Sequence, residues 1–381
     1  MNIGIDATNI LSFGGGFVHL ENILKYENHK KIDKIYIWSK KELIQKIKIN
    51  NNKIYFKTSF FINFNIITRV LWQFYFLKKE LKAHNCNLLF VLGGILSKQD
   101  IPSVSLIQNL LPFIDIKIFN YNILFRLKNY LLKKLHYLAI KKSNSIIFLT
   151  VFCKNLILKN IKKEISYEII KHGVENIFRL KKKKFKNILK CNYKNKFKIL
   201  YISKIENYKN HKNLILACKQ LENLNCPISL TLFGVENDKK MKNIEEFIVS
   251  NKCDKFVKVK KEVDYKQINK LYKNFDLHVY PSSCEAFGLI ILETIASSTP
   301  IVCSNLGTFR EILKKNTLYF NEKEINSIFL VMKKYIYNLY LRKKNTIKLY
   351  KESHKYSWEY TSKKTFNHLI NVYKKFYKKK F

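Results

Sequence analysis

Short apolar runs alternate along this chain with longer segments in which apolar residues recur every three or four positions. The runs predict strands, and the longer segments predict helices. The run Ile3–Asp6 is followed by three glycines, Gly14, Gly15 and Gly16, and then by helical spacing over 17–24. This order of strand, glycine loop and helix is typical of the first unit of a doubly wound parallel sheet. Further strands are predicted at Lys34–Trp38, Asn87–Leu92, Ser103–Gln108, Ser145–Leu149 and Glu168–Lys171, and helices at Thr68–Ala83 and Tyr121–Lys142.

A second alternating series begins after residues 180–196, which are mostly Lys and Asn and show little periodicity. We interpret 181–196 as an interdomain linker. The pattern predicts two Rossmann-like α/β domains, at 1–180 and 197–355, with ligands bound in a cleft between them. The predicted strands of the second series are Lys198–Ile202, Ile228–Phe233, Lys255–Val259, Leu277–Tyr280 and Pro300–Cys303. Its predicted helices are Lys212–Leu224, Met241–Ser250 and Tyr265–Lys273, a helix that begins at about Phe287, and further helices near the end of the chain.

Composition supports a folded protein of the cytoplasm. The 381 residues are 47% apolar, which is enough for a core in each domain. The eight Cys residues show no CxxC pair and no Cys/His ligand spacing, so neither a disulfide framework nor a zinc site is expected. Residues 1–6 predict a strand rather than a signal peptide, and apolar runs such as 88–96 are shorter than the roughly 20 residues that cross a bilayer.

The formal net charge of +43 is the largest departure from an ordinary composition, yet only five of the 71 basic residues are Arg. An excess of Lys, with many Asn, Ile, Phe and Tyr, is typical of an AT-rich genome, whereas selection for phosphate binding would favour Arg. Two interpretations stay open: a solvated surface shaped by codon bias, and a surface that attracts anionic phospholipid. A specific nucleic-acid partner is not expected, because no helix-turn-helix, zinc-finger or RNP-like signature is present.

The candidate chemistry is concentrated in residues 281–293, PSSCEAFGLIILE. Glu285 and Glu293 flank a Phe-Gly-Leu whose N–H groups would be among the free donors of a helix N-terminus, and such donors suit a diphosphate or sugar hydroxyls. In a continuous helix the two carboxylates would lie up to ~12 Å apart along the axis, so that each could meet a different part of one ligand. An amphipathic helix with two incidental glutamates is the alternative that the spacing alone leaves open.

This segment resembles the retaining, GT-B-fold glycosyltransferases of family 4, whose signature is Glu-x-Phe-Gly with a second Glu eight residues after the first. The likeness continues through Thr299–Asn305, Gly307 and Arg310–Ile312. It implies that Glu285 contacts the donor sugar and that Glu293 binds the nucleotide ribose. The donor-binding set that it implies also includes Ala286, Phe287, Gly288 and Leu289, with Ala286 standing where the family most often has Gly.

Three other stretches fit the same resemblance. In Tyr201–His211, Lys204 and Lys209 look like the two basic residues that bind the donor diphosphate, although Arg is commoner at the first position. The glycines at 14–16 resemble the loop that lets backbone approach the phosphate from the first domain. Residues 356–359 look like the start of the final helix, 356–381, which in GT-B enzymes crosses back to the first domain.

One departure from the family concerns acid–base chemistry. Many relatives have His-Asp before the proline at 112, and this chain has Gln108-Asn109, whose amides form hydrogen bonds but do not titrate near neutral pH. Asn109 and His172 are possible donor contacts, although His172 and His19 fit structural roles better. A retaining transfer in which the donor phosphate accepts the acceptor's proton needs no such histidine. No Asp-x-Asp triplet is present, so transfer without a metal ion or other cofactor is expected.

Aromatic residues gather in segment 60–79, where they alternate with Arg69, Lys78 and Lys79. A basic, aromatic helix can lie in a membrane interface, although core packing explains part of the pattern equally well. The aromatic members are Phe60, Phe61, Phe64, Trp72, Phe74, Tyr75 and Phe76.

The resemblance implies a retaining transfer of a hexose from a UDP- or GDP-sugar to a glycan or lipid-linked acceptor. Such enzymes assemble surface polysaccharide (lipopolysaccharide, O-antigen or capsule), and the expected location is the cytoplasm, at the inner face of the membrane. The alternative is a non-catalytic basic α/β protein that binds nucleic acid or anionic lipid. A phosphorylase with pyridoxal phosphate has little support, because no lysine stands out as a cofactor anchor.

Overall fold

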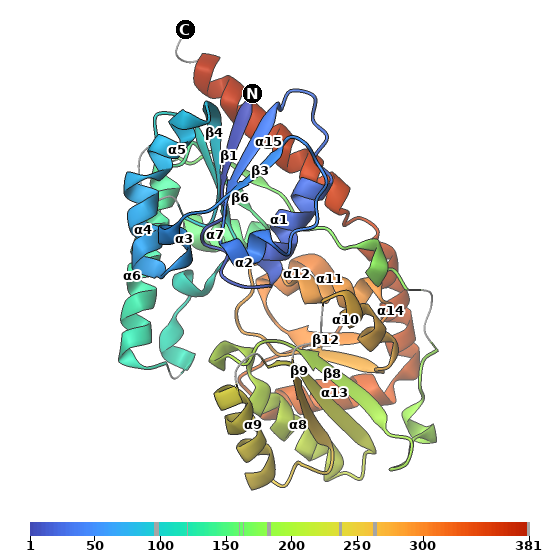
Figure 1. Ribbon diagram of the computed structural model, residues 1–381. Coiled ribbons are helices and arrows are strands. Elements are labelled where there is room, and N and C mark those ends of the chain that lie inside the picture. Colours follow the sequence, from blue (N-terminus) through green and yellow to red (C-terminus); the bar gives the residue numbers. More distant parts are fainter. Residues whose placement is uncertain are drawn as a thin grey trace. The chain divides into compact units, whose positions relative to one another are not determined.

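The computed structural model describes residues 1–94, 99–119, 121–159, 161–162, 164–180, 184–235, 238–261 and 265–378 (Figure 1). They form two compact units. Each unit is built around one parallel sheet, so the predicted fold class of two α/β domains is confirmed. Unit 1 comprises Met1–Lys117, Asn122–Gly173 and Ser357–Phe381, and unit 2 comprises Ile118–Tyr121 and Val174–Tyr356.

Unit 1 contains a seven-stranded sheet in the order β3-β2-β1-β4-β5-β6-β7, with every pair parallel. Strand β1 lies between β2 and β4, so the chain winds in opposite directions on its two sides. The strands are β1 (Asn2–Asp6), β2 (Lys34–Trp38), β3 (Ile54–Lys57), β4 (Cys86–Leu92), β5 (Ser103–Ile107), β6 (Ser145–Phe148) and β7 (Tyr167–Ile169). The helices are α1 (Gly15–Lys25), α2 (Lys41–Ile44), α3 (Phe60–Asn63), α4 (Ile66–Tyr75), α5 (Leu77–Ala83), α6 (Ile123–Lys142), α7 (Val151–Leu158) and α15 (Trp358–Lys378).

The last helix, α15, packs against α1, β4 and β5 of unit 1. Its apolar face is buried through Trp358, Phe366 and Leu369. Its polar contacts are also specific, since the Ser362 hydroxyl donates to the carbonyl of Ile23 at 2.6 Å. Helix α15 is therefore part of the core of unit 1.

Unit 2 contains a six-stranded sheet in the order β10-β9-β8-β11-β12-β13, again with every pair parallel. Strand β8 lies between β9 and β11, which makes β8 and β11 the strands at the switch in winding direction. The strands are β8 (Phe197–Ile202), β9 (Ile228–Val235), β10 (Val257–Lys261), β11 (Leu277–Tyr280), β12 (Ile301–Ser304) and β13 (Tyr319–Phe320). The helices are α8 (His211–Glu222), α9 (Asp238–Ser250), α10 (Tyr265–Lys273), α11 (Leu289–Ala296), α12 (Gly307–Leu313), α13 (Ile325–Tyr337) and α14 (Leu339–Ser353).

The predicted linker lies partly outside the described residues, because 181–183 are not among them. Residues 184–196 belong to unit 2, where Ile188 is buried and the carbonyl of Lys186 accepts a hydrogen bond from the guanidinium of Arg342. The chain passes from unit 1 to unit 2 after Gly173.

Segment 60–79 differs from its prediction in two respects. The single helix predicted at Thr68–Ala83 is two helices, α4 and α5, with a break at Phe76. Arg69 does not line an exposed basic face: it is buried, and burial lowers its pKa. Trp72 belongs to the core beside Trp38, with ring centroids 6.2 Å apart. The exposed aromatic residues of the segment are Phe60, Phe64, Phe74, Tyr75 and Phe76.

Candidate functional site

The predicted diphosphate and sugar contacts of unit 2 follow the two strands at its switch in winding direction. Ser203 and Lys204 come directly after β8, and Lys209 lies farther along the same loop. Pro281 comes directly after β11, four residues before Glu285. In open α/β sheets the crevice outside the carboxyl ends of two such strands is where ligands bind. The topology therefore brings both parts of the predicted donor site to one place.

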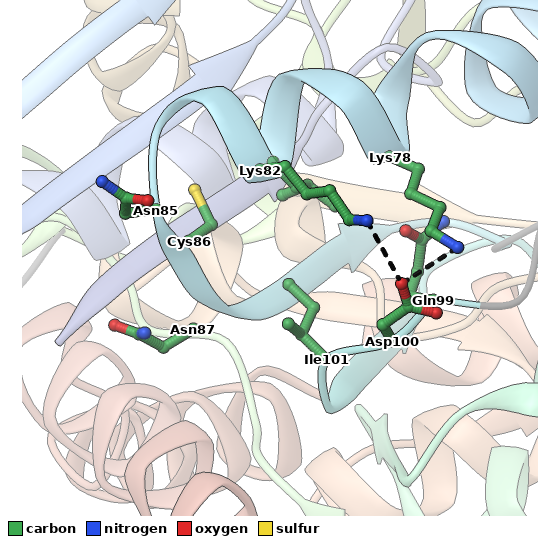
Figure 2. Close-up of a pocket in the computed structure, with 9 residues that line it drawn as sticks. Lys78, Lys82, Asn85, Cys86, Asn87, Gln99, Asp100 and Ile101 are labelled. Carbon is green, nitrogen blue, oxygen red and sulfur yellow. Dashed lines mark ion pairs between the residues drawn. The ribbon is translucent and has the colours of Figure 1, made fainter.

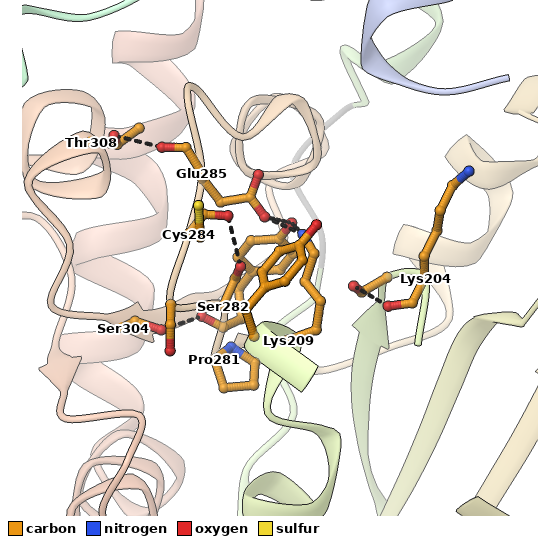
Figure 3. A network of polar contacts seen from close by, with 12 residues as sticks. Lys204, Lys209, Pro281, Ser282, Cys284, Glu285, Ser304 and Thr308 are labelled. Carbon is orange, nitrogen blue, oxygen red and sulfur yellow. Dashed lines mark hydrogen bonds and ion pairs between the residues drawn. The ribbon is translucent and has the colours of Figure 1, made fainter. Parts of the chain in front are cut away.

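At this place Lys209 and Glu285 form an ion pair, although they are 76 positions apart in the chain (Figure 3). Tyr280, the last residue of β11, donates its hydroxyl hydrogen to the same Glu285 oxygen, Oε1, at 2.8 Å. The side chains of Lys209 and Glu285 are only 11% and 16% exposed. Burial, together with the charge of Glu285, holds the pKa of Tyr280 well above its ordinary value, so the phenol stays a donor.

Hydrogen bonds from two side chains fix the loop that carries Glu285. The side-chain amide of Asn210 donates to the carbonyl of Pro281 and to the hydroxyl of Ser283, both at 2.7 Å. On the other side, the Thr308 hydroxyl donates to the carbonyl of Glu285 itself at 2.9 Å. Asn210 adopts a left-handed backbone with φ of 53°, which short amide side chains tolerate better than most. The carboxylate of Glu285 is therefore held by a loop that is anchored from two sides.

Lys204 does not join the ion pair. Its side chain extends away from Lys209 and Glu285 (Figure 3) and is half-buried. The Ser203 hydroxyl donates to the carbonyl of Lys204 at 3.0 Å, which stabilises the turn after β8. The two predicted basic residues thus differ: the charge of Lys209 is compensated by a carboxylate, whereas Lys204 points elsewhere.

Helix α11 begins at Leu289, two residues later than predicted. The preceding Gly288 has φ of 90°, a left-handed conformation that a residue with a Cβ adopts only at a cost, so it ends the loop and starts the helix. Phe287 and Ala286 belong to the loop, and both are buried. Of the three residues predicted to offer N–H groups at a helix N-terminus, Gly288 and Leu289 lie there, as the N-cap and the first residue of α11, and Phe287 does not. The helical spacing assumed between Glu285 and Glu293 is wrong for its first half.

Glu293 lies within α11 and is only 3% exposed. The hydroxyl of Tyr272, on α10, donates to its Oε2 at 3.2 Å. Tyr272 is itself fully buried, and burial and the charge of Glu293 raise its pKa well above its ordinary value. The structure therefore gives Glu293 a hydrogen-bond partner within unit 2, the hydroxyl of Tyr272. The contact of Glu293 with a ribose stays a prediction.

In unit 1 the predicted glycine loop leads directly into a helix. Gly14 precedes α1, and Gly15 and Gly16 are its first two residues. The first hydrogen bond of the helix runs from the N–H of Val18 to the carbonyl of Gly14 at 3.0 Å. A Cβ on Gly14 would meet no atom within 4 Å, so space is open beside this backbone. A helix N-terminus with open space in front of it suits an anion such as phosphate.

His172 and His19 form a buried pair in unit 1. Their Nδ1 atoms are 3.1 Å apart, so one ring donates to the other. Burial lowers the pKa of His19 to about 3 and, together with His19, lowers the pKa of His172 well below its ordinary value. The ring of Trp358 contacts both histidines, and a Cβ on Gly173 would lie 2.1 Å from the backbone N of Trp358. This close packing favours the structural role of both histidines.

Asn109 forms a local turn. Its Oδ1 accepts the N–H of Leu111 at 3.0 Å, and its side chain is exposed. An amide used in this way orders the loop after β5. A contact between Asn109 and the nucleotide-sugar donor would therefore have to use the Nδ2 group of this side chain.

Comparisons with known proteins show which sequences and folds this chain is similar to. Residues 181–353 match the sequence family described as glycosyl transferases group 1. The matched segment lies within unit 2. A 110-residue segment is 34% identical to an uncharacterized glycosyltransferase of Methanocaldococcus jannaschii, and covers 28% of this chain and 27% of that protein. A 117-residue segment is 28% identical to the O-antigen chain mannosyltransferase RfbU of Salmonella typhimurium, and covers 31% of this chain and 33% of that protein.

The matched segments thus span about a third or less of these two relatives. Solved structures extend the likeness of fold to nearly the whole chain. Sucrose-phosphate synthase of Thermosynechococcus elongatus gives a TM-score of 0.79 at 12% identity, over 98% of this chain and 99% of that chain. HepE of Anabaena, determined in complex with UDP and glucose, gives a TM-score of 0.71 at 16% identity, over 97% of this chain and 99% of that chain. At these identities the likeness shows the fold alone.

The segment that matches the glycosyl transferases group 1 family contains one site residue that was not predicted from the sequence. Tyr280 contacts both members of the ion pair, since its hydroxyl also lies 3.3 Å from Nζ of Lys209. One signal was present: a Tyr is the last residue of an apolar strand and directly precedes the loop of Glu285. A phenol at the carboxyl end of a strand beside the switch in winding direction is placed where a ligand site is expected.

A hollow of about 350 Å³ lies elsewhere, in unit 1, at the amino end of β4 (Figure 2). There Asp100 forms ion pairs with Lys78 at 2.9 Å and Lys82 at 3.8 Å. The side chains of all three residues are exposed to solvent. Exposed pairs of this kind contribute little free energy. None of the predicted site residues lines this hollow. Among the described residues, no group of three or more His, Cys, Asp or Glu side chains is placed to hold a metal ion.

Proposed function

We propose that this protein is a retaining glycosyltransferase that transfers a hexose from a nucleotide-diphosphate sugar to a glycan or lipid-linked acceptor. The observation that carries the proposal is the Lys209–Glu285–Tyr280 cluster, which lies at the switch point of the unit that matches the glycosyl transferases group 1 family. A diphosphate needs a cation, and a sugar that loses its leaving group needs a nearby carboxylate. This cluster supplies both, next to each other.

The ion pair also suggests how the donor binds. Without donor, Glu285 compensates the ammonium of Lys209 in a place with little solvent. A bound diphosphate would share Lys209 and leave the carboxylate of Glu285 free to face the sugar. Lys204 and the N-terminus of α1 are the other groups that we assign to phosphate.

Retention is proposed because two glutamates occupy the signature positions and the two histidines considered for the site, His19 and His172, are both buried. His19 and His172 are buried as a neutral pair, and Asn109 does not titrate. The oxygen of the departing donor phosphate is then the group that accepts the acceptor's proton. It can do so on the face of the sugar that the leaving group occupied, which preserves the configuration of the anomeric carbon.

Surface polysaccharide is the proposed product, because RfbU is an O-antigen chain mannosyltransferase. UDP- and GDP-sugars are the proposed donors, and the structure of HepE with UDP supports a nucleoside diphosphate as the shared part. We propose further that no metal ion takes part, since the chain has no Asp-x-Asp triplet and its lysines can meet the diphosphate charge.

The first test is nucleotide binding followed by donor hydrolysis. UDP or GDP at low-millimolar concentration is expected to raise Tm, because a ligand that binds only the folded state stabilises it. One sugar in a panel of UDP- and GDP-sugars is expected to be hydrolysed or transferred faster than the rest. EDTA is expected to change that rate less than about twofold. If neither nucleotide shifts Tm and no donor is consumed, the alternative of a non-catalytic basic α/β protein replaces the proposal.

The location that we propose is the inner face of the cytoplasmic membrane. No helix among the described residues combines the length and the apolar character needed to cross a bilayer. Contact by segment 60–79 is supported by exposed Phe60, Phe64 and Tyr75, which are 72%, 65% and 66% exposed. The lysine-rich surface adds attraction to anionic lipid.

The wild-type protein is expected to sediment with vesicles that contain phosphatidylglycerol and to stay in solution with phosphatidylcholine alone. Binding should weaken as salt increases, because screening reduces attraction between lysines and anionic headgroups. The measurement is co-sedimentation over a range of salt concentrations. Equal binding to neutral vesicles at high salt would contradict an electrostatic attachment.

A further inference from the structure

We propose that helix α6 is an interfacial helix that lies on an anionic phospholipid surface. The inference rests on the location proposed above and names a second element, outside segment 60–79, that makes the contact. It depends on exposed side chains, helix geometry and charge within unit 1.

Helix α6 exposes an apolar stripe. Its exposed members recur at steps of one, three and four residues, which places most of them on one side of a helix. Single exposed apolar residues are ordinary, whereas a contiguous exposed stripe marks an interaction surface. The members and their exposed fractions are Ile123 (80%), Leu124 (75%), Leu127 (56%), Tyr130 (53%), Leu131 (52%) and Leu138 (50%).

The other side of α6 is occupied by the rest of unit 1. Asn129 is buried and donates its Nδ2 hydrogen to the carbonyl of Leu111 at 3.3 Å. Ala139 and Ile140 are fully buried. The Asn122 side chain accepts the N–H of Phe125 at 2.9 Å and so caps the start of the helix. The exposed stripe therefore lies on the side of α6 opposite its buried residues.

The charge of α6 specifies the partner. Of its twenty residues none is acidic and six are basic: Arg126, Lys128, Lys133, Lys134, Lys141 and Lys142. Lys128 and Lys134 are exposed among the stripe residues, and Nζ of Lys134 lies 4.7 Å from the ring centroid of Tyr130. An apolar stripe bordered by lysines matches a surface with acyl chains beneath anionic headgroups.

A second copy of the chain fits this stripe less well. In a twofold dimer the same patch meets itself, so the lysines among the stripe residues, Lys128 and Lys134, would lie close to the lysines of the other copy. Repulsion between like charges with no acidic residue in the helix opposes such contact. Helix α4 also exposes apolar residues, but its only basic residue is the buried Arg69. Of these two helices, α6 alone combines an exposed apolar stripe with exposed basic residues.

The test compares two triple variants on phosphatidylcholine vesicles with and without phosphatidylglycerol. Leu124→Gln/Leu127→Gln/Leu131→Gln removes three stripe residues that are 75%, 56% and 52% exposed. Its matched control, Leu189→Gln/Leu330→Gln/Leu224→Gln in unit 2, changes leucines that are 79%, 53% and 51% exposed. The α6 variant is expected to lose about tenfold or more of its partition onto anionic vesicles, and the control less than about twofold.

A fluorescent probe gives a second readout that does not depend on sedimentation. The native Trp38, Trp72 and Trp358 are all buried, so their emission is a constant background. Leu127→Trp is expected to shift its emission to the blue when phosphatidylglycerol vesicles are added, and Leu189→Trp is expected not to shift. The pair reports directly whether this face of α6 leaves water.

Three outcomes would overturn the assignment of α6. If the α6 triple variant binds anionic vesicles as well as the wild type does, and the emission of Leu127→Trp does not shift, α6 is not the contact. A wild-type dimer that becomes monomeric in the α6 variant, with vesicle binding unchanged, assigns the stripe to a second copy. Absence of any wild-type binding to anionic vesicles rejects both the helix and the location. Donor hydrolysis measured without lipid tests the transfer reaction separately, and it should be equal in all these variants.

Discussion

The variant Glu285→Gln is expected to lower kcat about 10²–10³-fold, while the donor KM changes less than about threefold. As the bond from sugar to phosphate breaks, positive charge develops on the sugar ring. A carboxylate that faces the ring stabilises this charge more than it stabilises the ground state. Gln keeps the size and the acceptor oxygen of Glu285 but removes the charge, so the change isolates the electrostatic contribution.

The structure adds an effect on stability to this prediction. The side chain of Lys209 is 11% exposed and loses its counter-charge in the variant, which is expected to lower the free energy of unfolding by about 3 kcal/mol. A bound diphosphate would supply new negative charge. UDP or GDP should therefore raise the Tm of Glu285→Gln by more than it raises the Tm of the wild type.

The measurements are steady-state kinetics at saturating and limiting donor, and thermal unfolding with and without nucleotide. Glu352→Gln is a matched control, since Glu352 forms ion pairs with Lys314 and Lys355 in the same unit but has no assigned role. It should leave kcat and KM near wild type. Turnover by Glu285→Gln that equals wild type would remove Glu285 from the chemistry.

The sequence predicts the sheet of unit 2 well because its strands are apolar runs separated by amphipathic helices. Strand β11 and helix α10 match their predicted limits, and β8, β9, β10 and β12 are each displaced by no more than two residues at either end. Strand β13, of two residues, was missed, because two residues carry no periodicity. In unit 1, β3 was missed for a similar reason, since its four residues have no fully buried member.

The contacts of the candidate site could be predicted only in part. Strand order brings the ends of β8 and β11 together, so proximity of Lys209 and Glu285 follows once the topology is known. Their direct pairing, and the participation of Tyr280, depend on side-chain positions that no local pattern encodes. The left-handed φ of Gly288 shifts the start of α11, and a single sequence gives no direct sign of it.

Which side chains are buried and which are exposed was the least predictable feature. Arg69 lies among aromatic residues in a segment for which both a membrane interface and core packing were considered, and the structure shows that it is buried. The exposed stripe of α6 was not recognised, because a helix that shows apolar spacing is usually assumed to bury its apolar side. His19 and His172 pair across 153 positions, beside Trp358, whose backbone packs closely against Gly173.

The variant Glu293→Ala is expected to raise the donor KM while kcat stays within about threefold of wild type. If the carboxylate holds a ribose hydroxyl, it contributes to binding in the ground state and the transition state alike. Loss of a charged hydrogen bond of about 1.5–3 kcal/mol corresponds to a rise in KM of roughly 10- to 150-fold. The expected pattern is thus the reverse of that for Glu285→Gln.

The burial of Glu293 makes a structural role the competing explanation, and a second variant separates the two. Glu293→Ala leaves the hydroxyl of Tyr272 without this acceptor in the core, so Tm should also fall, by an amount that reflects about 1–3 kcal/mol. Tyr272→Phe removes the same hydrogen bond but keeps the carboxylate. A carboxylate that only supports α10 would give similar KM values in both variants, whereas a ribose contact raises KM in Glu293→Ala alone. If Glu293→Ala abolishes turnover while Glu285→Gln stays near wild type, the roles of the two glutamates are exchanged.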